Sequence, residues 1–177
     1  MIRRRLATAW LDGCSGCHMS FLDIDERIMD LLDRLELVYC PLIDVKTIPE
    51  GIDFALVEGA VSSLADKEEI LSLREKAEVL IAFGDCAVTA NVPGMRNQFK
   101  VVDTLSRSYI ENSLSNPMMP GSEVPKLMEY AKPLHEYVRV DLFLPGCPPP
   151  ADVIFSTLRD LIDGRPPVVE GRTRFGA

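Results

Sequence analysis

The chain has 177 residues, of which 47% are hydrophobic and 26% are charged, a balance typical of one globular domain with a full core. Its net charge of −8 argues against a nucleic-acid partner, because phosphates require a basic surface, and no apolar run approaches the roughly 20 residues that span a bilayer. The apolar stretch behind the basic start ends at Asp12, too early for a secretory signal, so we expect a cytoplasmic protein.

Apolar runs alternate with helical patterns along the chain. The expected strands are Leu6–Leu11, Leu37–Val45, Ile52–Val57, Val79–Phe83 and Val140–Leu144. The expected helices are Ser20–Leu35, Asp66–Lys76, Gln98–Tyr109, Lys126–Tyr137 and Ala151–Ile162. Asp66 is a plausible N-cap, and Pro41 suggests that the second strand lies at an edge. This alternation predicts an α/β fold, with a parallel five-stranded sheet in flavodoxin-like order and helices on both faces.

We expect residues 1–177 to form a single domain, because the sequence shows no internal repeat and no linker. The tail at 164–177 is rich in Pro, Gly and Arg, and is either mobile or draped over a partner.

Four of the five cysteines follow expected strands. Cys14 and Cys17 come after the first strand, Cys86 after the fourth and Cys147 after the fifth. Because the carboxyl ends of parallel strands meet at one edge of a sheet, we expect these thiols to converge on one cluster or one metal. Cys40 falls inside the second expected strand and is interpreted as a buried apolar side chain. An odd number of cysteines in a reducing compartment argues against a disulfide framework.

The spacing of the thiols favours an iron–sulfur centre. The pair Cys14-Ser-Gly-Cys17 alone fits zinc, a redox dithiol or iron–sulfur. Structural zinc sites usually combine two short Cys-x-x-Cys pairs, whereas Cys86 and Cys147 stand singly and far apart. A 4Fe–4S cube needs one thiolate for each iron, which suits this pattern better. Zinc and free thiols remain the alternatives.

Two further residues are candidates for a role near this centre. His18 directly follows Cys17 and is interpreted as a polar neighbour of the centre or as an exposed loop residue, with ligation a minor alternative. Glu58 ends the third expected strand and is either a buried functional carboxylate or a solvated strand end. Asp12 and Asp85 are expected to cap local backbone. No phosphate-binding glycine loop is present, so no motif indicates FMN. FMN is still possible, because the fold type and the sheet edge could hold it.

Four motifs occur in a specific order: Cys14-Ser-Gly-Cys17, Val57-Glu-Gly59, Phe83-Gly-Asp-Cys86 and Pro145-Gly-Cys-Pro-Pro149. As a set they resemble the small subunits of NiFe hydrogenases and the related cluster-bearing subunit of respiratory complex I. The resemblance implies a flavodoxin-like fold and one 4Fe–4S cluster held by the four cysteines. It matches Glu58 to the family glutamate, a possible proton relay or neighbour of the cluster.

Differences between this chain and some members of these families indicate which type of subunit it resembles most. The complex I subunit has adjacent cysteines at the first motif, whereas two residues separate Cys14 from Cys17 here, which favours hydrogenase. The chain is similar to the short, single-cluster small subunits of cytoplasmic NAD-reducing, bidirectional hydrogenases. That implies an electron-transfer oxidoreductase subunit with no catalytic residue of its own.

The same resemblance implies two kinds of partner. A NiFe large subunit would split H2, and diaphorase subunits would carry flavin, further clusters and the NAD site. A quinone- or ferredoxin-linked cluster subunit and a flavin-binding module are the alternatives.

Overall fold

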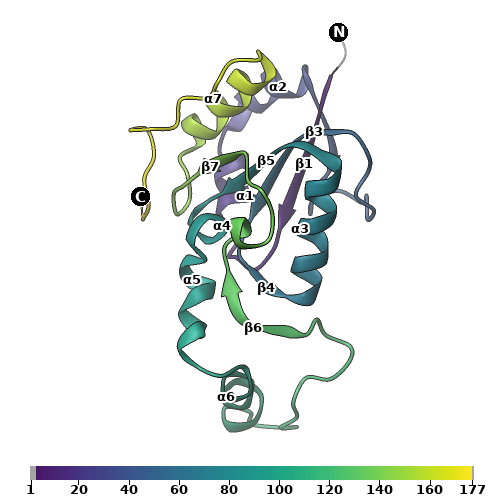
Figure 1. Ribbon diagram of the computed structural model, residues 1–177, viewed down its shortest axis with the longest axis vertical. Helices are drawn as coiled ribbons and strands as arrows, with labels where there is room; N and C mark the ends of the chain where they lie inside the picture. Colours follow the sequence, from purple (N-terminus) through teal and green to yellow (C-terminus); the bar gives the residue numbers. More distant parts are fainter. Residues whose placement is uncertain (1–2, 177) are drawn as a thin grey trace.

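The computed structural model describes residues 3–176 and is organised around a five-stranded parallel sheet (Figure 1). The strands are β1 (Arg4–Trp10), β2 (Leu35–Tyr39), β3 (Ile52–Glu58), β5 (Ala77–Phe83) and β7 (Leu142–Leu144). They stand in the order β2-β1-β3-β5-β7. Numbered within this sheet alone, the order is 2-1-3-4-5, which is the flavodoxin-like arrangement. The predicted fold class is therefore confirmed, and so is the edge position of the second strand.

Both faces of the sheet are buried. Along β3, Phe54 and Leu56 belong to one apolar core, whereas Ala55 and Val57 belong to the other. Successive side chains of a strand point to opposite faces, so two cores require every position to be apolar. This explains why the strands read as continuous apolar runs rather than as an alternating pattern.

Helices cover the two faces unequally. The core with Ala55 and Val57 is closed by α3 (Leu64–Lys76) through Ile70 and Leu73. The opposite core is closed by three helices: α1 (Gly16–Leu22), α2 (Ile28–Leu32) and α7 (Ala151–Ile162). Figure 1 shows α3 on one side of the sheet and α2 with α7 on the other.

The start of α3 is fixed by a capping box. The Ser63 hydroxyl accepts a hydrogen bond from the Asp66 amide at 3.1 Å, and the Asp66 carboxylate accepts one from the Ser63 amide at 2.8 Å. The expectation that Asp66 itself is the N-cap is therefore wrong. It occupies the third helical position, where it completes the box.

Replacing Ser63 by alanine should destabilise the fold by about 1 kcal/mol, because one amide at the first turn of α3 loses its acceptor. Urea unfolding followed by circular dichroism measures this loss. Ser72→Ala, in the middle of the same helix, is the matched control and should leave the unfolding midpoint unchanged or slightly raised. Equal midpoints for Ser63→Ala and wild type would show that the cap contributes nothing.

One helix prediction and one strand prediction differ from the structure early in the chain. The expected helix Ser20–Leu35 is divided into α1, a 3-10 turn at Asp25–Arg27 and α2, and Asp25 adopts a left-handed φ of 63°. Leu35 begins β2 instead, and that strand ends at Tyr39, ahead of Pro41. Cys40 therefore lies just after the strand rather than inside it, although it is buried as expected.

The expected helix Lys126–Tyr137 is wrong. Its first part forms the strand β6 (Leu127–Lys132), which pairs antiparallel with β4 (Val61–Ser63), and a 3-10 turn follows at Leu134–Glu136. Pro125 and Pro133 flank β6 and leave room for only a short element between them. The pairing partner β4 lies far back in the sequence, so tertiary contact decides the conformation.

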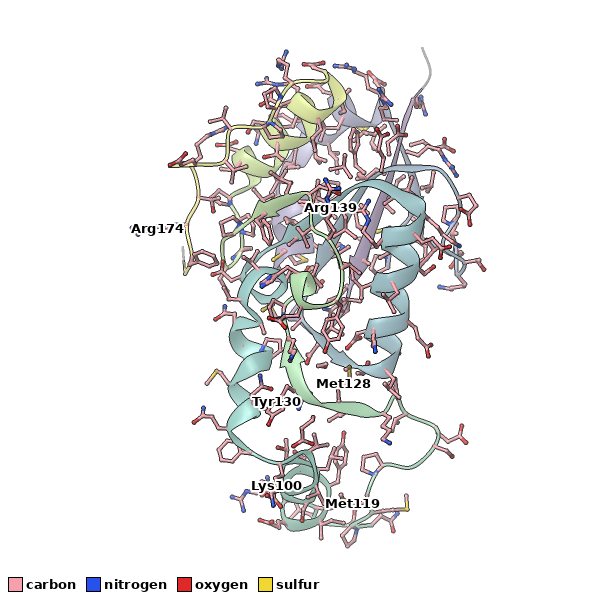
Figure 2. The ribbon with its side chains drawn as sticks, in the orientation of Figure 1. Lys100, Met119, Met128, Tyr130, Arg139 and Arg174 are labelled. Carbon is pink, nitrogen blue, oxygen red and sulfur yellow. The ribbon has the colours of Figure 1, made fainter. Side chains whose placement is uncertain are left out.

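A lobe extends from the carboxyl end of β5. It contains α4 (Asp85–Thr89), α5 (Asn91–Gly94), the 3-10 turn Met95–Gln98, α6 (Val101–Ser106) and the π-helical turn Arg107–Glu111. The expected helix Gln98–Tyr109 therefore begins later, at Val101, and its last part belongs to the π-helical turn rather than to an α-helix. Figure 1 shows α6 at the far end of the molecule from α2 and α7, and Figure 2 places Lys100 and Met119 at that end.

Two side chains anchor the near part of this lobe. The Arg96 guanidinium donates to the carbonyl oxygens of Ser62, Met128 and Glu129 at 3.0–3.2 Å. The Asn97 amide group exchanges two hydrogen bonds of 2.8 Å with the Ala131 backbone. These contacts fasten the 3-10 turn to the β4–β6 ribbon. Within residues 3–176, no helix has the length and apolar character needed to cross a membrane.

Candidate functional site

Three loops at the carboxyl ends of strands bring four cysteines to one edge of the sheet. Cys14 and Cys17 follow β1, Cys86 lies in α4 just after β5, and Cys147 follows β7. A hollow of about 230 Å³ opens at this edge, and its lining residues are Asp12, Gly13, Cys14, Cys86, Val92, Pro93 and Cys147. Cys17 is buried, and Cys14 and Cys147 are exposed. Cys14, Cys86 and Cys147, which the sequence places far apart, therefore line one hollow, and the Cys17 sulfur lies beside them against Gly84.

The loop that carries Cys17 packs closely on the loop before Cys86. Gly84 has a φ of 85°, and a Cβ atom at this position would overlap the Cys17 sulfur. Gly84 also donates its amide to the Leu144 carbonyl at 2.8 Å, which ties β5 to the end of β7. Only glycine meets both demands, a left-handed backbone and no side chain.

Asp85 links the Cys86 loop to the Cys147 loop. Its carboxylate is buried and accepts the Gly146 amide at 2.7 Å, while its own amide donates to the Gly146 carbonyl at 2.9 Å. The other carboxylate oxygen accepts the Gly176 amide at 2.7 Å. Asp85 thus caps backbone, as expected, but it does so between three segments rather than locally.

The described part of the C-terminal tail lies against this same edge. Besides the Gly176 contact, the Thr173 hydroxyl donates to the Pro145 carbonyl at 2.5 Å. On the other side of the Cys147 loop, the Ser20 hydroxyl of α1 donates to the Pro149 carbonyl at 2.5 Å. The loop that carries Cys147 is therefore held from two sides by segments distant in the sequence.

A buried polar chain lies behind the first cysteine loop. Glu58 is 1% exposed, and its Oε2 atom accepts the His18 amide at 3.0 Å and lies 2.6 Å from His18 Nδ1. His18 Nε2 lies 3.0 Å from the Thr8 hydroxyl, and both side chains are buried. Glu58 is therefore not a solvated strand end, and His18 is not an exposed loop residue. Both nitrogens of the His18 ring are engaged, so the ring has no free atom to ligate a metal.

The surroundings of the inward-facing thiols disfavour the thiolate form. Burial raises the pKa of Cys17, and the proximity of Glu58 and of the other three cysteines raises it further, because each would add a like charge when ionised. Burial also raises the pKa of Cys86, while a hydrogen bond from the Val92 backbone opposes that rise. Metals bind thiolates, so loading the site must release these protons.

The donor set at this edge consists of four thiols, and thiolates are ligands of both zinc and iron–sulfur clusters. Within residues 3–176, no three His, Cys, Asp or Glu side chains are grouped to ligate one metal ion. Zn–S bonds of about 2.3 Å would require tetrahedral sulfurs about 3.8 Å apart. A cube spreads its four ligands over four irons and asks for thiolates that surround a volume, which a hollow lined by cysteines provides.

Sequence reasoning did not identify two residues that complete this edge. Thr8 lies in the apolar run of β1, and nothing in that run signals that its hydroxyl meets His18. Asn91 begins α5, and its side-chain amide lies 3.8 Å from the Cys147 sulfur. The only sequence feature that could have indicated Asn91 is that it is a polar residue shortly after Cys86.

The fold and this edge define a protein of the α/β class with a flavodoxin-like sheet and four thiols gathered at the carboxyl ends of its strands. Residues 14–161 match the family described as NADH ubiquinone oxidoreductase, 20 Kd subunit. The chain belongs to this family, and its relatives include subunits of hydrogenases, which are oxidoreductases.

Curated relatives support this grouping. The chain is 42% identical to the NAD-reducing hydrogenase HoxS subunit delta of Cupriavidus necator over 167 residues, covering 92% of this chain and 80% of that protein. It is also 42% identical to a subunit of the F420-non-reducing hydrogenase of Methanocaldococcus jannaschii, covering 89% of this chain and 55% of that protein. The chain thus spans most of the first relative and about half of the second.

Solved structures agree with these relatives. A chain of the NAD+-reducing [NiFe]-hydrogenase in its H2-reduced state superposes with a TM-score of 0.94 at 40% identity, covering 98% of this chain and 99% of that one. A chain of the [NiFeSe]-hydrogenase of Dm. baculatum superposes with a TM-score of 0.61 at 19% identity, covering 92% of this chain and 63% of that one. The second likeness supports the fold alone.

Proposed function

We propose that this chain is the electron-transfer small subunit of a cytoplasmic NAD-reducing NiFe hydrogenase. The observation that carries the proposal is that Cys14, Cys86 and Cys147 line one hollow and that the Cys17 sulfur lies against Gly84, two residues before Cys86. These residues would hold one 4Fe–4S cluster, which supplies one-electron transfer between the Ni–Fe centre of a large subunit and a diaphorase module. The likeness to the NAD+-reducing enzyme favours NAD as the distant acceptor.

The chain's own residues hold and shield this site. Gly84 and Gly146 leave room for the cysteine loops, and Asp85 locks two of those loops together. Cys14 and Cys147 are exposed, so a partner must cover the edge to keep water and oxygen away. A large subunit seated over the hollow would do so, and the diaphorase subunits would receive the electrons.

Purification under native, anaerobic conditions tests the proposal. The tagged chain should bring down a large subunit and flavin-containing subunits, and the assembly should reduce NAD with H2. Purified alone, the chain should show no hydrogen-dependent dye reduction, since the H2-splitting site belongs to the partner. Dye reduction by the isolated chain, or a stable assembly without a nickel-containing partner, would overturn this division of labour.

Glu58 is proposed to support proton movement at the subunit boundary. Its carboxylate lies 2.6 Å from His18 Nδ1, so it can exchange a proton with that ring, whereas glutamine cannot. Glu58→Gln should lower hydrogen turnover by roughly a hundredfold or more, the lower bound for losing an acid–base group. Iron content and assembly should stay at wild-type levels, because glutamine keeps the size and one acceptor oxygen.

An exposed carboxylate gives the matched control. Glu68→Gln removes a charge on the outer surface of α3 and should not affect turnover. If Glu58→Gln turns over H2 as wild type does across neutral pH, Glu58 only shapes the loop, and the proton route belongs wholly to the partner.

A further inference from the structure

The chain makes a sharp turn directly beside the cysteine hollow. Ala90 separates α4 from α5 and has a left-handed φ of 64°, a strained conformation for a residue with a Cβ atom. The turn is held because the Ala90 side chain packs in a small core with Ala60 and Ala131. Its consequence is that α5 starts at the hollow, where Val92 and Pro93 form part of the lining.

This placement directs hydrogen-bond donors at the cysteine sulfurs. The Asn91 side-chain amide lies 3.8 Å from the Cys147 sulfur, and the Val92 backbone lowers the pKa of Cys86, as an N–H donor to its sulfur would. On the other side of the hollow, the Gly16 amide lies 3.4 Å from the Cys14 sulfur. Two of these donors belong to the backbone. The Asn91 donor belongs to a side chain, so substitution can remove it without changing the main chain.

We propose that Asn91 is a positioning residue that acts through Cys147 to raise the reduction potential of the cluster. The inference rests on the proposed function, since it requires the four cysteines to hold that cluster. When a reductant delivers one electron, the added negative charge is spread in part over the ligand sulfurs, and no bond to Asn91 or Cys147 forms or breaks. An N–H group that points at the Cys147 sulfur stabilises that negative charge. Because the reduced state carries more of this charge, the contact stabilises the reduced state more than the oxidised state and so raises the reduction potential.

We expect the Asn91 donor to affect the potential most when a partner subunit covers the site. Cys147 and Asn91 are both exposed in the isolated chain, where water competes for the sulfur. A partner seated over the hollow would exclude that water and strengthen the remaining N–H···S contact. The contribution of Asn91 should therefore be measured in the complex of this chain with its large subunit.

Three substitutions at Asn91 separate the donor from the shape of the side chain. Asn91→Leu keeps the approximate volume without an N–H group, and should shift the cluster midpoint potential to a more negative value. Asn91→Asp replaces the donor by a negative charge and should shift the potential further in the same direction. Asn91→Gln restores an amide on a longer stem and should recover part of the loss. The readout is an anaerobic dithionite titration followed by electron paramagnetic resonance.

The control is Asn112→Leu, which makes the same chemical change just after the π-helical turn of the distal lobe and should leave the potential unchanged. Iron and sulfide analysis of each sample distinguishes two failures. An iron-free wild type would refute the proposed cluster, whereas an iron-loaded wild type with unshifted Asn91 variants would refute only the role of Asn91. If every Asn91 variant loses its iron, Asn91 holds Cys147 in place rather than setting the potential, and the inference is wrong as stated.

Discussion

Replacing Cys86 by alanine should lower the iron content of the chain to less than roughly half of the wild-type value, because one iron of the cube loses its thiolate. Hydrogen-dependent NAD reduction should fall by at least about tenfold, the cost typical even of removing an outer partner of a metal site. Cys86 suits this test because it lies half-buried on α4 and lines the hollow directly. Iron and sulfide analysis with a turnover assay measures both effects.

Cys40→Ala is the matched control. Cys40 is the fifth cysteine, and it lies just after β2, the edge strand of the sheet, with its sulfur accepting the Leu42 amide at 3.4 Å. Its loss should reduce stability slightly through a small cavity and leave the iron content intact. Equal iron in wild type and Cys86→Ala would defeat the ligand assignment, and iron loss in Cys40→Ala would show that the two sites are not independent.

Replacing Gly84 by alanine should prevent normal loading of the site. The added methyl group would overlap the sulfur of Cys17, and that sulfur is buried and cannot move freely aside. With φ 85° and ψ 164°, the Gly84 backbone lies in a region that essentially only glycine populates, which adds a cost of about 1–3 kcal/mol for a residue with a Cβ atom. We expect a clear drop in the thermal unfolding midpoint together with a large loss of iron.

Gly164→Ala separates steric overlap from backbone strain. Gly164 also has a positive φ, of 69°, but a Cβ atom there meets nothing within 4 Å. The control should pay the conformational cost alone, with a smaller drop in the unfolding midpoint and full iron content. If Gly84→Ala binds iron as well as Gly164→Ala does, the contact between Gly84 and Cys17 does not shape the site.

The sheet was largely predictable because its strands are buried on both faces. Runs such as Ile52–Val57 and Val79–Phe83 are apolar at almost every position, which marks a central parallel strand without any tertiary information. β6 was not predictable in this way. It becomes a strand because β4 offers it an antiparallel partner from far back in the sequence, and no local pattern encodes that pairing.

The site likewise contains parts that could be predicted from the sequence and parts that depend on tertiary packing. The four cysteines could be brought together from the sequence, since each follows a strand of one parallel sheet. The contacts of His18 with Glu58 and Thr8 depend on how α1 packs against β1 and β3. No local sequence pattern indicates that packing. The position of Asn91 depends on a left-handed turn at Ala90, a residue type that gives no sign of such a turn.

The central claim is that this chain carries one 4Fe–4S cluster that exchanges electrons with the H2-splitting partner. The most direct measurement is iron and acid-labile sulfide per chain in the purified complex, combined with electron paramagnetic resonance before and after exposure to H2. We expect the cysteine site to contribute about four iron and four sulfide, with a reduced-cluster signal that appears under H2 and is lost in Cys86→Ala. One zinc per chain, bound flavin without iron at this site, or a cluster that H2 does not reduce would contradict it.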